Sequence, residues 1–159
     1  MRIRVLCVGK IKEKFYTEAI AEYAKRLSRY CRLEFTEVAD EKTPDGASEA
    51  MERQIKEKEG ERLLANIRDS DHVIALAIDG KKYDSVAFSQ RLEKLGVDGI
   101  SDIDFVIGGS LGLDERVLHR ADEKLSFSDM TFPHQLMRVI LLEQIYRGYR
   151  IMNHEPYHK

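Results

Sequence analysis

One short segment constrains the fold of this chain more than any other: the continuous apolar run Val73-Ile74-Ala75-Leu76-Ala77-Ile78, closed by Asp79-Gly80. A strand with one solvated face alternates apolar and polar residues, whereas a strand inside a parallel sheet is covered on both faces and is apolar throughout. The run is far too short to cross a membrane. It therefore predicts a central strand of a parallel sheet.

Helix and strand patterns alternate on both sides of this run. Apolar residues at three- and four-residue spacing predict helices, and short alternating or continuous apolar stretches predict strands. Strands are expected over 3–8, 33–39, 73–78, 103–107 and 124–127, and helices over 15–30, 49–67, 85–95, 113–120 and 133–150. The alternating stretch 33–39 suits a sheet edge. Without repeats or linkers, residues 1–159 are expected to form one α/β domain, with a mainly parallel sheet and helices on both faces.

Cysteine usage and the N-terminus indicate the compartment. Cys7 and Cys31 are too few for a disulfide framework, and neither has a histidine at metal-ligand spacing. The first residues lead directly into a strand, without the layout of a signal peptide. We expect a cytoplasmic protein that binds no membrane and no metal.

The net charge of −2 argues at first against nucleic acid as a partner, but the charges are unevenly distributed. Residues 1–33 hold nine basic and three acidic side chains, and residues 134–159 hold four and two. If both ends pack on one face, they form a basic footprint; scattered solvated charges explain the first segment equally well. A footprint of this size does not hold free RNA tightly at physiological salt, so a structured target is required.

Glycine-rich and small-polar loops point to a ligand. Ligands of open α/β sheets bind beyond the carboxyl ends of the strands, and three segments follow such ends: Asp79-Gly80-Lys81, Gly108-Gly109-Ser110-Leu111-Gly112, and the segment from Ser126 to Phe132. Without a β-carbon, glycine lets the backbone approach a ligand. Gly80 alone is better explained by a turn, whereas Gly108, Gly109 and Gly112 together favour a ligand site. The spacing is neither a Walker loop nor Gly-x-Gly-x-x-Gly, which disfavours a dinucleotide site.

The helix over 133–150 is apolar around most of its girth, which is typical of a buried helix or of one shared between subunits. Of the two, a homodimer contact is preferred, closely followed by a buried core. Arg138, Arg147 and Arg150 are expected on the remaining surface. Because Arg138 lies one turn after His134, these two are candidates for substrate binding; a solvated position suits Arg147 better.

The chain ends in Asn153-His154-Glu155-Pro156-Tyr157-His158-Lys159, called here the tail. Short polar termini usually fray. Histidine, however, titrates near neutrality and accepts protons, and tyrosine stacks on unstacked bases. A function is therefore favoured for the tail.

Four segments together resemble a known family: Leu76 with Asp79-Gly80-Lys81, the loop Ile107–Gly112, the stretch Leu125–Leu136 and the tail. They are similar to the bacterial ribosomal large-subunit pseudouridine N3-methyltransferases of the SPOUT class, over essentially the whole chain. The usual tail of that family is Asn-His-Pro-Tyr-His; here Glu155 stands between His154 and Pro156.

The resemblance implies a C-terminal trefoil knot, a homodimer through the C-terminal helix, and S-adenosylmethionine as methyl donor. The implied substrate is a pseudouridine of a 23S rRNA stem-loop near the decoding region, in the assembled ribosome. Matching the family's motifs to this sequence implies that the cofactor is bound by Leu76, Gly108, Phe127, Ser128, Asp129, Met130, Thr131 and Phe132. The glycine pattern adds Gly80, Gly109 and Gly112 to these candidates.

Catalysis in such an enzyme consists mainly of positioning, with help for the proton on N3. The candidate catalytic residues are His154 or His158 as proton acceptor and Tyr157 and Arg150 as groups that position the base. The competing hypothesis is a non-catalytic, ribosome-associated protein that binds a nucleotide or S-adenosylmethionine. An oxidoreductase of the Rossmann type is disfavoured, because Gly-x-Gly-x-x-Gly is missing.

Overall fold

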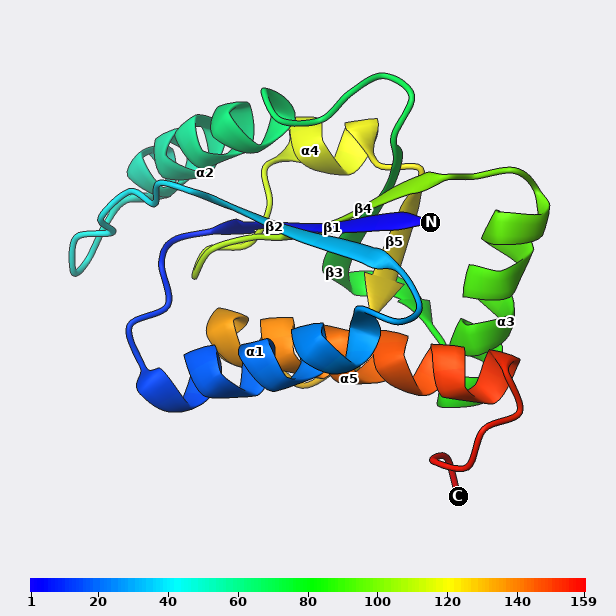
Figure 1. Cartoon of the computed structure of the whole chain (residues 1–159). Helices are drawn as coiled ribbons and strands as arrows, with labels where there is room; N and C mark the ends of the chain where they lie inside the picture. The colour runs from blue at the N-terminus through cyan, green and yellow to red at the C-terminus, as the bar shows by residue number, and fades with distance from the viewer.

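Five strands and five helices alternate along the chain in the computed structural model, which describes residues 1–159 (Figure 1). The elements are β1 (Arg2–Val8), α1 (Lys14–Leu27), β2 (Arg32–Val38), α2 (Glu49–Leu64), β3 (His72–Lys82), α3 (Ser85–Val97), β4 (Asp102–Ile107), α4 (Glu115–Arg120), β5 (Glu123–Ser126) and α5 (His134–Met152). The predicted order of helices and strands is confirmed, and most boundaries lie within three residues of the predicted ones.

The strands form one sheet in the order β2-β1-β4-β3-β5, and every neighbouring pair is parallel. The α/β prediction is thus confirmed, and β2 lies at an edge as its alternating pattern indicated. β3 lies between β4 and β5. The first half of its apolar run, Val73 to Ala75, is buried, as expected for an inner strand.

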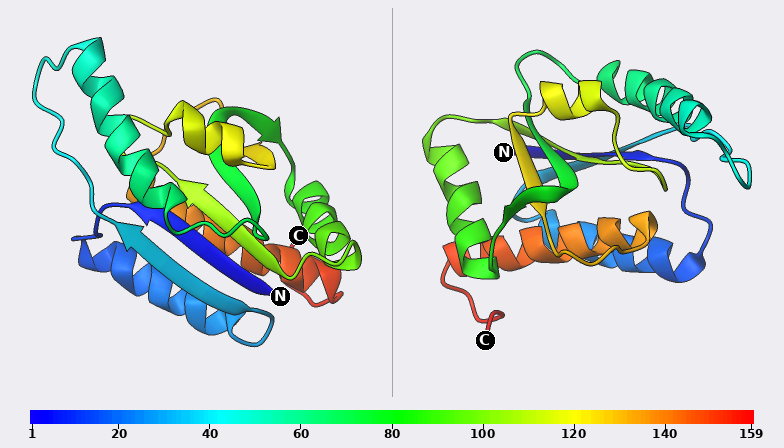
Figure 2. Two further views of the ribbon diagram at one scale, coloured as in Figure 1. Left: turned by 90° about the horizontal axis from the view of Figure 1, so that it is seen from above. Right: turned by 180° about the vertical axis from the view of Figure 1, so that it is seen from behind.

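Helices cover both faces of the sheet, so the molecule has three layers (Figure 2). α2 and α4 lie on one face, whereas α1, α5 and α3 lie on the other (Figures 1 and 2). Side chains of β1 point to both faces of the sheet and so contribute to two hydrophobic cores. Ile3 and Val5 pack with α3 and α5, and Leu6 and Val8 pack with α2 and α4. The side chain of Ser48 caps α2 by accepting a hydrogen bond from the Met51 amide at 3.2 Å.

The prediction that a turn at Asp79-Gly80 ends the third strand is wrong. β3 continues to Lys82, and its register against β5 shifts between Leu76 and Lys81. A β-carbon on Gly80 would lie 2.7 Å from the backbone of Leu125. Gly80 therefore permits two strands to approach closely at an irregularity, a use of glycine that local sequence does not distinguish from a turn.

A buried charge cluster lies at the amino ends of the strands. Asp104 is fully buried and accepts hydrogen bonds from Arg4 at 3.1 and 2.8 Å; the nearly buried Asp71 accepts one from Arg4 at 3.1 Å. Arg2 also binds Asp71, at 3.4 Å. Two of the nine N-terminal basic residues are therefore neutralised inside the fold. The basic footprint that the N-terminal segment supplies is correspondingly smaller.

Burial raises the pKa of Asp104 from 3.8 to about 6. Burial also disfavours the Asp71 carboxylate, but hydrogen bonds from Asp104 and the Arg68 amide hold its pKa below the usual value. Below about pH 6, Asp104 is therefore the member of the pair that holds a proton, while Asp71 is ionised. Since the folded state keeps this proton to a higher pH than the unfolded chain, the associated stability is present below about pH 4 and lost as the pH rises to about 6.

We expect this loss to disappear in Asp104→Asn. Between pH 4 and pH 7, the free energy of unfolding of the wild type should fall by up to about 3 kcal/mol more than that of the variant. Urea unfolding at several pH values measures the difference. Asp102→Asn changes a side chain that is 29% exposed in the same region, and its free energy of unfolding should depend on pH as that of the wild type does. The same pH dependence in the wild type and Asp104→Asn would refute the raised pKa of Asp104.

No helix is both long enough and apolar enough to span a bilayer. The threading of the C-terminal segment into a knot stays a prediction.

Candidate functional site

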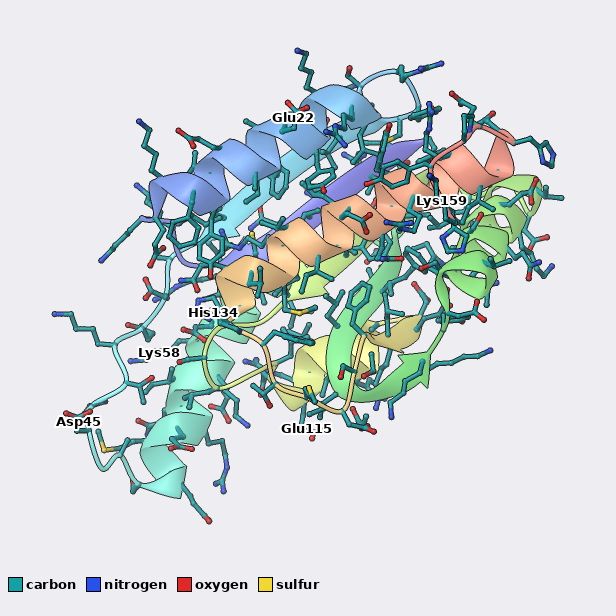
Figure 3. The ribbon with its side chains drawn as sticks, turned by 90° about the horizontal axis from the view of Figure 1, so that it is seen from below. Glu22, Asp45, Lys58, Glu115, His134 and Lys159 are labelled. Atoms are coloured by element: carbon teal, nitrogen blue, oxygen red, sulfur yellow. The ribbon has the colours of Figure 1, made fainter.

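A cavity of about 440 Å³ lies at the carboxyl ends of β4 and β5, against residues 76–79 within β3 and beside the first turn of α5. Figure 3 shows His134 at this end of α5, next to the loops. Because all strands are parallel, their carboxyl ends share one edge, which is where open α/β sheets bind ligands. Of the predicted binding residues, the lining includes Leu76, Gly108, Gly109, Gly112, Phe127, Ser128, Met130, Thr131, Phe132 and His134.

The chemical character of this cavity restricts its ligand. Its lining is largely apolar, with the middle of β3 contributing Leu76 to Ile78, and it contains no lysine or arginine. Asp79 is the one carboxylate among the lining residues. A polyphosphate usually requires cationic side chains as well as backbone amides, whereas a flat heterocycle with a positively charged group suits these walls. The cavity therefore favours a ligand without phosphates.

The glycine loop folds back on itself. Gly109 and Gly112 form an isolated antiparallel bridge, and the Gly112 amide donates to the Gly109 carbonyl at 3.0 Å. Gly112 has a φ of 87°, in the left-handed region. A β-carbon on Gly108 would lie 2.6 Å from the carbonyl carbon of Gly112. Gly108 is thus required by the loop itself, in addition to any ligand contact.

We expect Gly108→Val to weaken binding of S-adenosylmethionine, the cofactor that the family resemblance implies, by at least about tenfold. The added side chain must displace the Gly112 backbone, and the loop then leaves the cavity wall. Isothermal titration on the folded variant measures the affinity. Gly99→Ala, at a positive φ with open space around it, is the control: it should lower stability but leave the affinity unchanged. Normal affinity in Gly108→Val would contradict this role.

The second loop, from Ser126 to Phe132, turns its small side chains onto its own backbone. Ser126 donates to the Ser128 carbonyl at 3.1 Å, and the Ser128 hydroxyl accepts from the Met130 amide at 3.0 Å. Phe127 packs edge-on against Phe88 of α3. Asp129 points away, pairs with Lys82 and is not part of the lining. The loop is ordered by local hydrogen bonds before any ligand binds.

His134 and Arg138, predicted as a substrate-binding pair, are placed differently. His134 lines the cavity, and burial together with the Arg138 charge lowers its pKa, so its ring is neutral at pH 7. Arg138 was expected at the surface but is only 1% exposed. Its guanidinium donates to the Val8 and Gly9 carbonyls, both at 2.8 Å, and to Glu37 at 2.7 Å. Arg138 therefore joins α5 to the ends of β1 and β2.

The tail begins at the opposite end of α5 from the cavity and folds back along the helix, so that Lys159 lies beside α5 (Figure 3). Glu143, to which Tyr157 is hydrogen-bonded, lies nine residues after His134, about 14 Å along the helix axis at a rise of about 1.5 Å per residue. None of the predicted catalytic residues Arg150, His154, Tyr157 and His158 lines the cavity. Within one chain, the structure does not bring the predicted catalytic and cofactor-binding residues together.

The tail is nevertheless ordered, because α5 binds it. Tyr157 donates to Glu143 at 3.1 Å, and Arg147 donates to Glu143 at 2.6 Å while its guanidinium lies 4.6 Å from the centre of the Tyr157 ring. Arg147 was expected to be solvated; instead, 24% of its side chain is exposed. The i,i+4 spacing of Glu143 and Arg147 was a signal that could have identified them as partners.

Arg147 also decides how His158 can act. Its Nη1 lies 3.2 Å from Nδ1 of His158. A guanidinium only donates hydrogen bonds, so Nδ1 is the acceptor and the neutral ring carries its proton on Nε2. In this conformation His158 offers a donor to a substrate. No hydrogen bond within the chain occupies the ring of His154, which is exposed.

His154 occupies the turn that ends α5. Its φ is 54°, and it is the one residue other than glycine with positive φ. The Glu155 amide donates to the Arg150 carbonyl at 2.8 Å, and the His154 amide donates to that of Ile151 at 3.1 Å. This is the Schellman pattern, in which glycine usually occupies the left-handed position. The turn directs the tail back towards α1.

Glu59 is a residue near the site that the sequence did not reveal. It lies in the Lys/Glu-rich part of α2, expected to be solvated, yet it is only 5% exposed. Its carboxylate accepts from the Glu41 amide at 3.0 Å, and its other oxygen would lie 3.2 Å from a β-carbon on Gly109. Burial raises its pKa. Glu59 therefore supports the glycine loop from the side of α2.

Comparisons with known proteins agree with this arrangement. Residues 1–158 match the family model described as predicted SPOUT methyltransferase. The Ribosomal RNA large subunit methyltransferase H of Bifidobacterium adolescentis is 62% identical and that of Clostridium tetani 61% identical, each over 100% of both chains. The structure of a probable methylase family protein from Haemophilus influenzae Rd KW20 matches with a TM-score of 0.56 and 13% identity, over 99% of this chain and 70% of that one, a likeness of fold alone.

Proposed function

The chain belongs to the SPOUT methyltransferase family, and its similar relatives are named for methylating large-subunit ribosomal RNA; from this we propose that it transfers a methyl group from S-adenosylmethionine to N3 of a pseudouridine in 23S rRNA. The proposed substrate is the stem-loop near the decoding region, in the assembled ribosome. The reaction takes place in the cytoplasm. A single SPOUT domain, residues 1–159, carries it out.

The observation that carries the choice of cofactor is the cavity lined by glycine backbone and apolar side chains, without a basic residue. Gly108, Gly109 and Gly112 leave main-chain groups accessible to an adenosine, and Leu76 and Phe127 supply apolar contacts. Asp79 provides a negative charge for a cationic ligand. When bound, S-adenosylmethionine supplies a methyl group that its sulfonium already activates. The protein's own contribution is to hold that group in line with the acceptor, worth about 7–11 kcal/mol of the barrier.

The proton on N3 of the base requires an acceptor. We propose His154 for this step, because its ring is free, whereas Nδ1 of His158 is occupied by Arg147. His158 then donates from Nε2, and Tyr157 packs against the base. Burial and its bond to Glu143 raise the pKa of Tyr157 to about 12, so its hydroxyl stays protonated. Arg150 helps to position the tail, and His134 contacts the substrate from the cavity side.

No tail residue lines the cavity of its own chain, which supports a homodimer in which one protomer's tail serves its partner's cavity. α5 offers a surface for this contact. Leu136, Val139 and Ile140 are half-buried and belong to neither core. Such side chains on a helix are readily covered by a second copy of that helix.

We expect Ile140→Glu to convert the dimer into monomers, because the interface would bury an unpaired charge. Sedimentation velocity measures the change, and methyl transfer should be lost with it. Gln90→Glu, on an exposed position of α3, should remain dimeric. A dimer of unchanged stability in Ile140→Glu would exclude this surface as the interface.

The two chain ends meet beside the tail, which supports an RNA contact there. α1 and α5 lie side by side (Figure 1), and Arg29 approaches Glu155 at 3.6 Å. Lys25 is exposed on α1, Arg29 in the turn after it and Lys159 on the tail. These cations can bind phosphates of a structured RNA that also reaches the partner's cavity.

The proposal is tested by incubating the protein with tritiated S-adenosylmethionine and 70S ribosomes. Label should enter 23S rRNA, and reverse transcription should stop at one pseudouridine, because a methyl group on N3 blocks Watson–Crick pairing. Free 50S subunits form the second arm and test the need for an assembled ribosome. A non-catalytic binding protein would bind the cofactor and transfer no label; that result would overturn the proposed activity.

A further inference from the structure

The carboxylate of Glu155 lies where the tail, the end of α5 and the end of α1 meet. Its Oε1 accepts a hydrogen bond from the Tyr30 hydroxyl at 2.8 Å, and its Oε2 pairs with Nη1 of Arg150. Arg29 adds a weaker contact at 3.6 Å. Only 24% of the Glu155 side chain and 16% of that of Arg150 are exposed. Glu155 thus attaches the tail to the turn that follows α1.

Arg150 is committed to this attachment. Besides Glu155 it donates to the Tyr30 hydroxyl at 3.2 Å and to the Pro156 carbonyl at 3.0 Å. Its Nε is buried without a partner. Nη1 is fully occupied by Glu155 and Tyr30, and Nη2 donates to Pro156, so most of the guanidinium is committed to the tail and Tyr30. Its role is to hold Glu155 and Pro156.

The segment after Glu155 is held by a separate set of contacts, those of Tyr157 and His158 with Glu143 and Arg147. These contacts lie on α5 alone. Without Glu155, the tail would keep its helix-end turn and its contact with Glu143 but lose its link to the turn that follows α1. The direction in which Tyr157 and His158 leave the molecule would then be less restricted.

We propose that Glu155 is a positioning residue: by tying the tail to Tyr30 and Arg150, it holds Tyr157 and His158 in the direction needed to meet the RNA substrate. The inference rests on the proposed function, in which the tail takes part in methyl transfer. Glu155 itself touches neither the base nor the cofactor. Displacement of a reacting group by about 1 Å can cost about a hundredfold in rate, so a loosened tail should affect the transfer step strongly.

The test compares Glu155→Ala with Glu155→Gln, which keeps the shape and one acceptor but removes the charge. Glu155→Ala should lower kcat with 70S ribosomes by about ten- to a hundredfold, and Glu155→Gln by less. Affinity for S-adenosylmethionine should not change. Carboxypeptidase should remove Lys159 and His158 faster from Glu155→Ala than from the wild type, which reports tail release directly. Glu22→Ala, which removes an exposed carboxylate of α1 paired with Arg26, should match the wild type in all of these.

Tyr30→Phe removes the partner in the turn that follows α1. Its effect should be smaller, and the double variant Tyr30→Phe/Glu155→Ala should be no slower than Glu155→Ala alone, because both changes break the same link. A lower melting temperature of Glu155→Ala with unchanged kcat and unchanged carboxypeptidase release would overturn the inference and leave Glu155 a merely stabilising residue.

Truncation separates this inference from the proposed function. If the chain without residues 153–159 methylates normally, the methyltransferase activity stands, but the tail takes no part and the positioning role of Glu155 fails with it. If the truncated chain is inactive while Glu155→Ala is fully active, only the positioning role of Glu155 is refuted.

Discussion

Deletion of residues 153–159 is expected to reduce methyl transfer to 23S rRNA by about 10²- to 10⁴-fold, the usual contribution of a positioned proton acceptor. Affinity for S-adenosylmethionine should stay within a few fold, because no tail residue lines the cavity. Single-turnover transfer from tritiated cofactor to 70S ribosomes and isothermal titration measure the two effects. Normal turnover in the truncated protein would exclude the tail from the reaction.

Substitution at His154 separates the imidazole from the shape of the tail. His154→Gly is well suited to this, since glycine takes the left-handed position of the helix-end turn more readily than histidine. The tail of His154→Gly should therefore keep its direction while the proton acceptor is lost. Most of the loss seen on truncation should appear in this variant. Full activity of His154→Gly would transfer the acceptor role to another group.

Arg138→Met is expected to destabilise the fold by about 3–5 kcal/mol, the usual cost of removing one partner of a buried ion pair. The substitution leaves the Val8 and Gly9 carbonyls without their donor, and each unpaired buried acceptor costs about 1–3 kcal/mol. Loss of the ion pair with Glu37 contributes less to this destabilisation, because 38% of the Glu37 side chain is exposed and water can replace the guanidinium. Urea unfolding measures the difference.

Two further measurements make the Arg138 prediction specific. Arg26→Met removes an exposed pair with Glu22 and should change stability by no more than about 0.5 kcal/mol. In Arg138→Met, the pKa of His134 should rise towards its usual value, because the neighbouring positive charge that lowers it is gone. A stability loss of Arg138→Met no larger than that of Arg26→Met would contradict the buried anchor.

Local periodicity was sufficient to predict the helices and strands, because in each of them the spacing of the apolar residues matches the face that is buried. It failed where distant residues decide the outcome. The end of β3 depends on its register shift against β5, about 45 residues later in the chain. In the sequence, a glycine such as Gly80 looks the same whether it forms a turn or allows two strands to approach closely. The parallel order of the sheet followed from the buried run, whereas the pairing of β5 with β3 did not.

Only part of the candidate site was predicted, again because local sequence does not show contacts between distant residues. The residues of the two loops are contiguous in sequence, so their joint position at one cavity follows from the sheet. Arg138 and Glu59 are charged residues that a pattern of burial assigns to the surface. They are buried because their partners, the Gly9 carbonyl and the Glu41 amide, come from other segments. No single-sequence signal identifies such partners.

Because the cavity lies beside the first turn of α5 and the tail follows its last turn, each protomer of the proposed dimer supplies the donor half of one catalytic centre and the acceptor half of the other. Two inactive versions of the protein, one damaged in the loop and one lacking the tail, should then rescue each other when they are produced in the same cell. Their hybrid contains one centre built entirely from undamaged halves. Such mutual rescue is impossible when every centre is completed within a single chain.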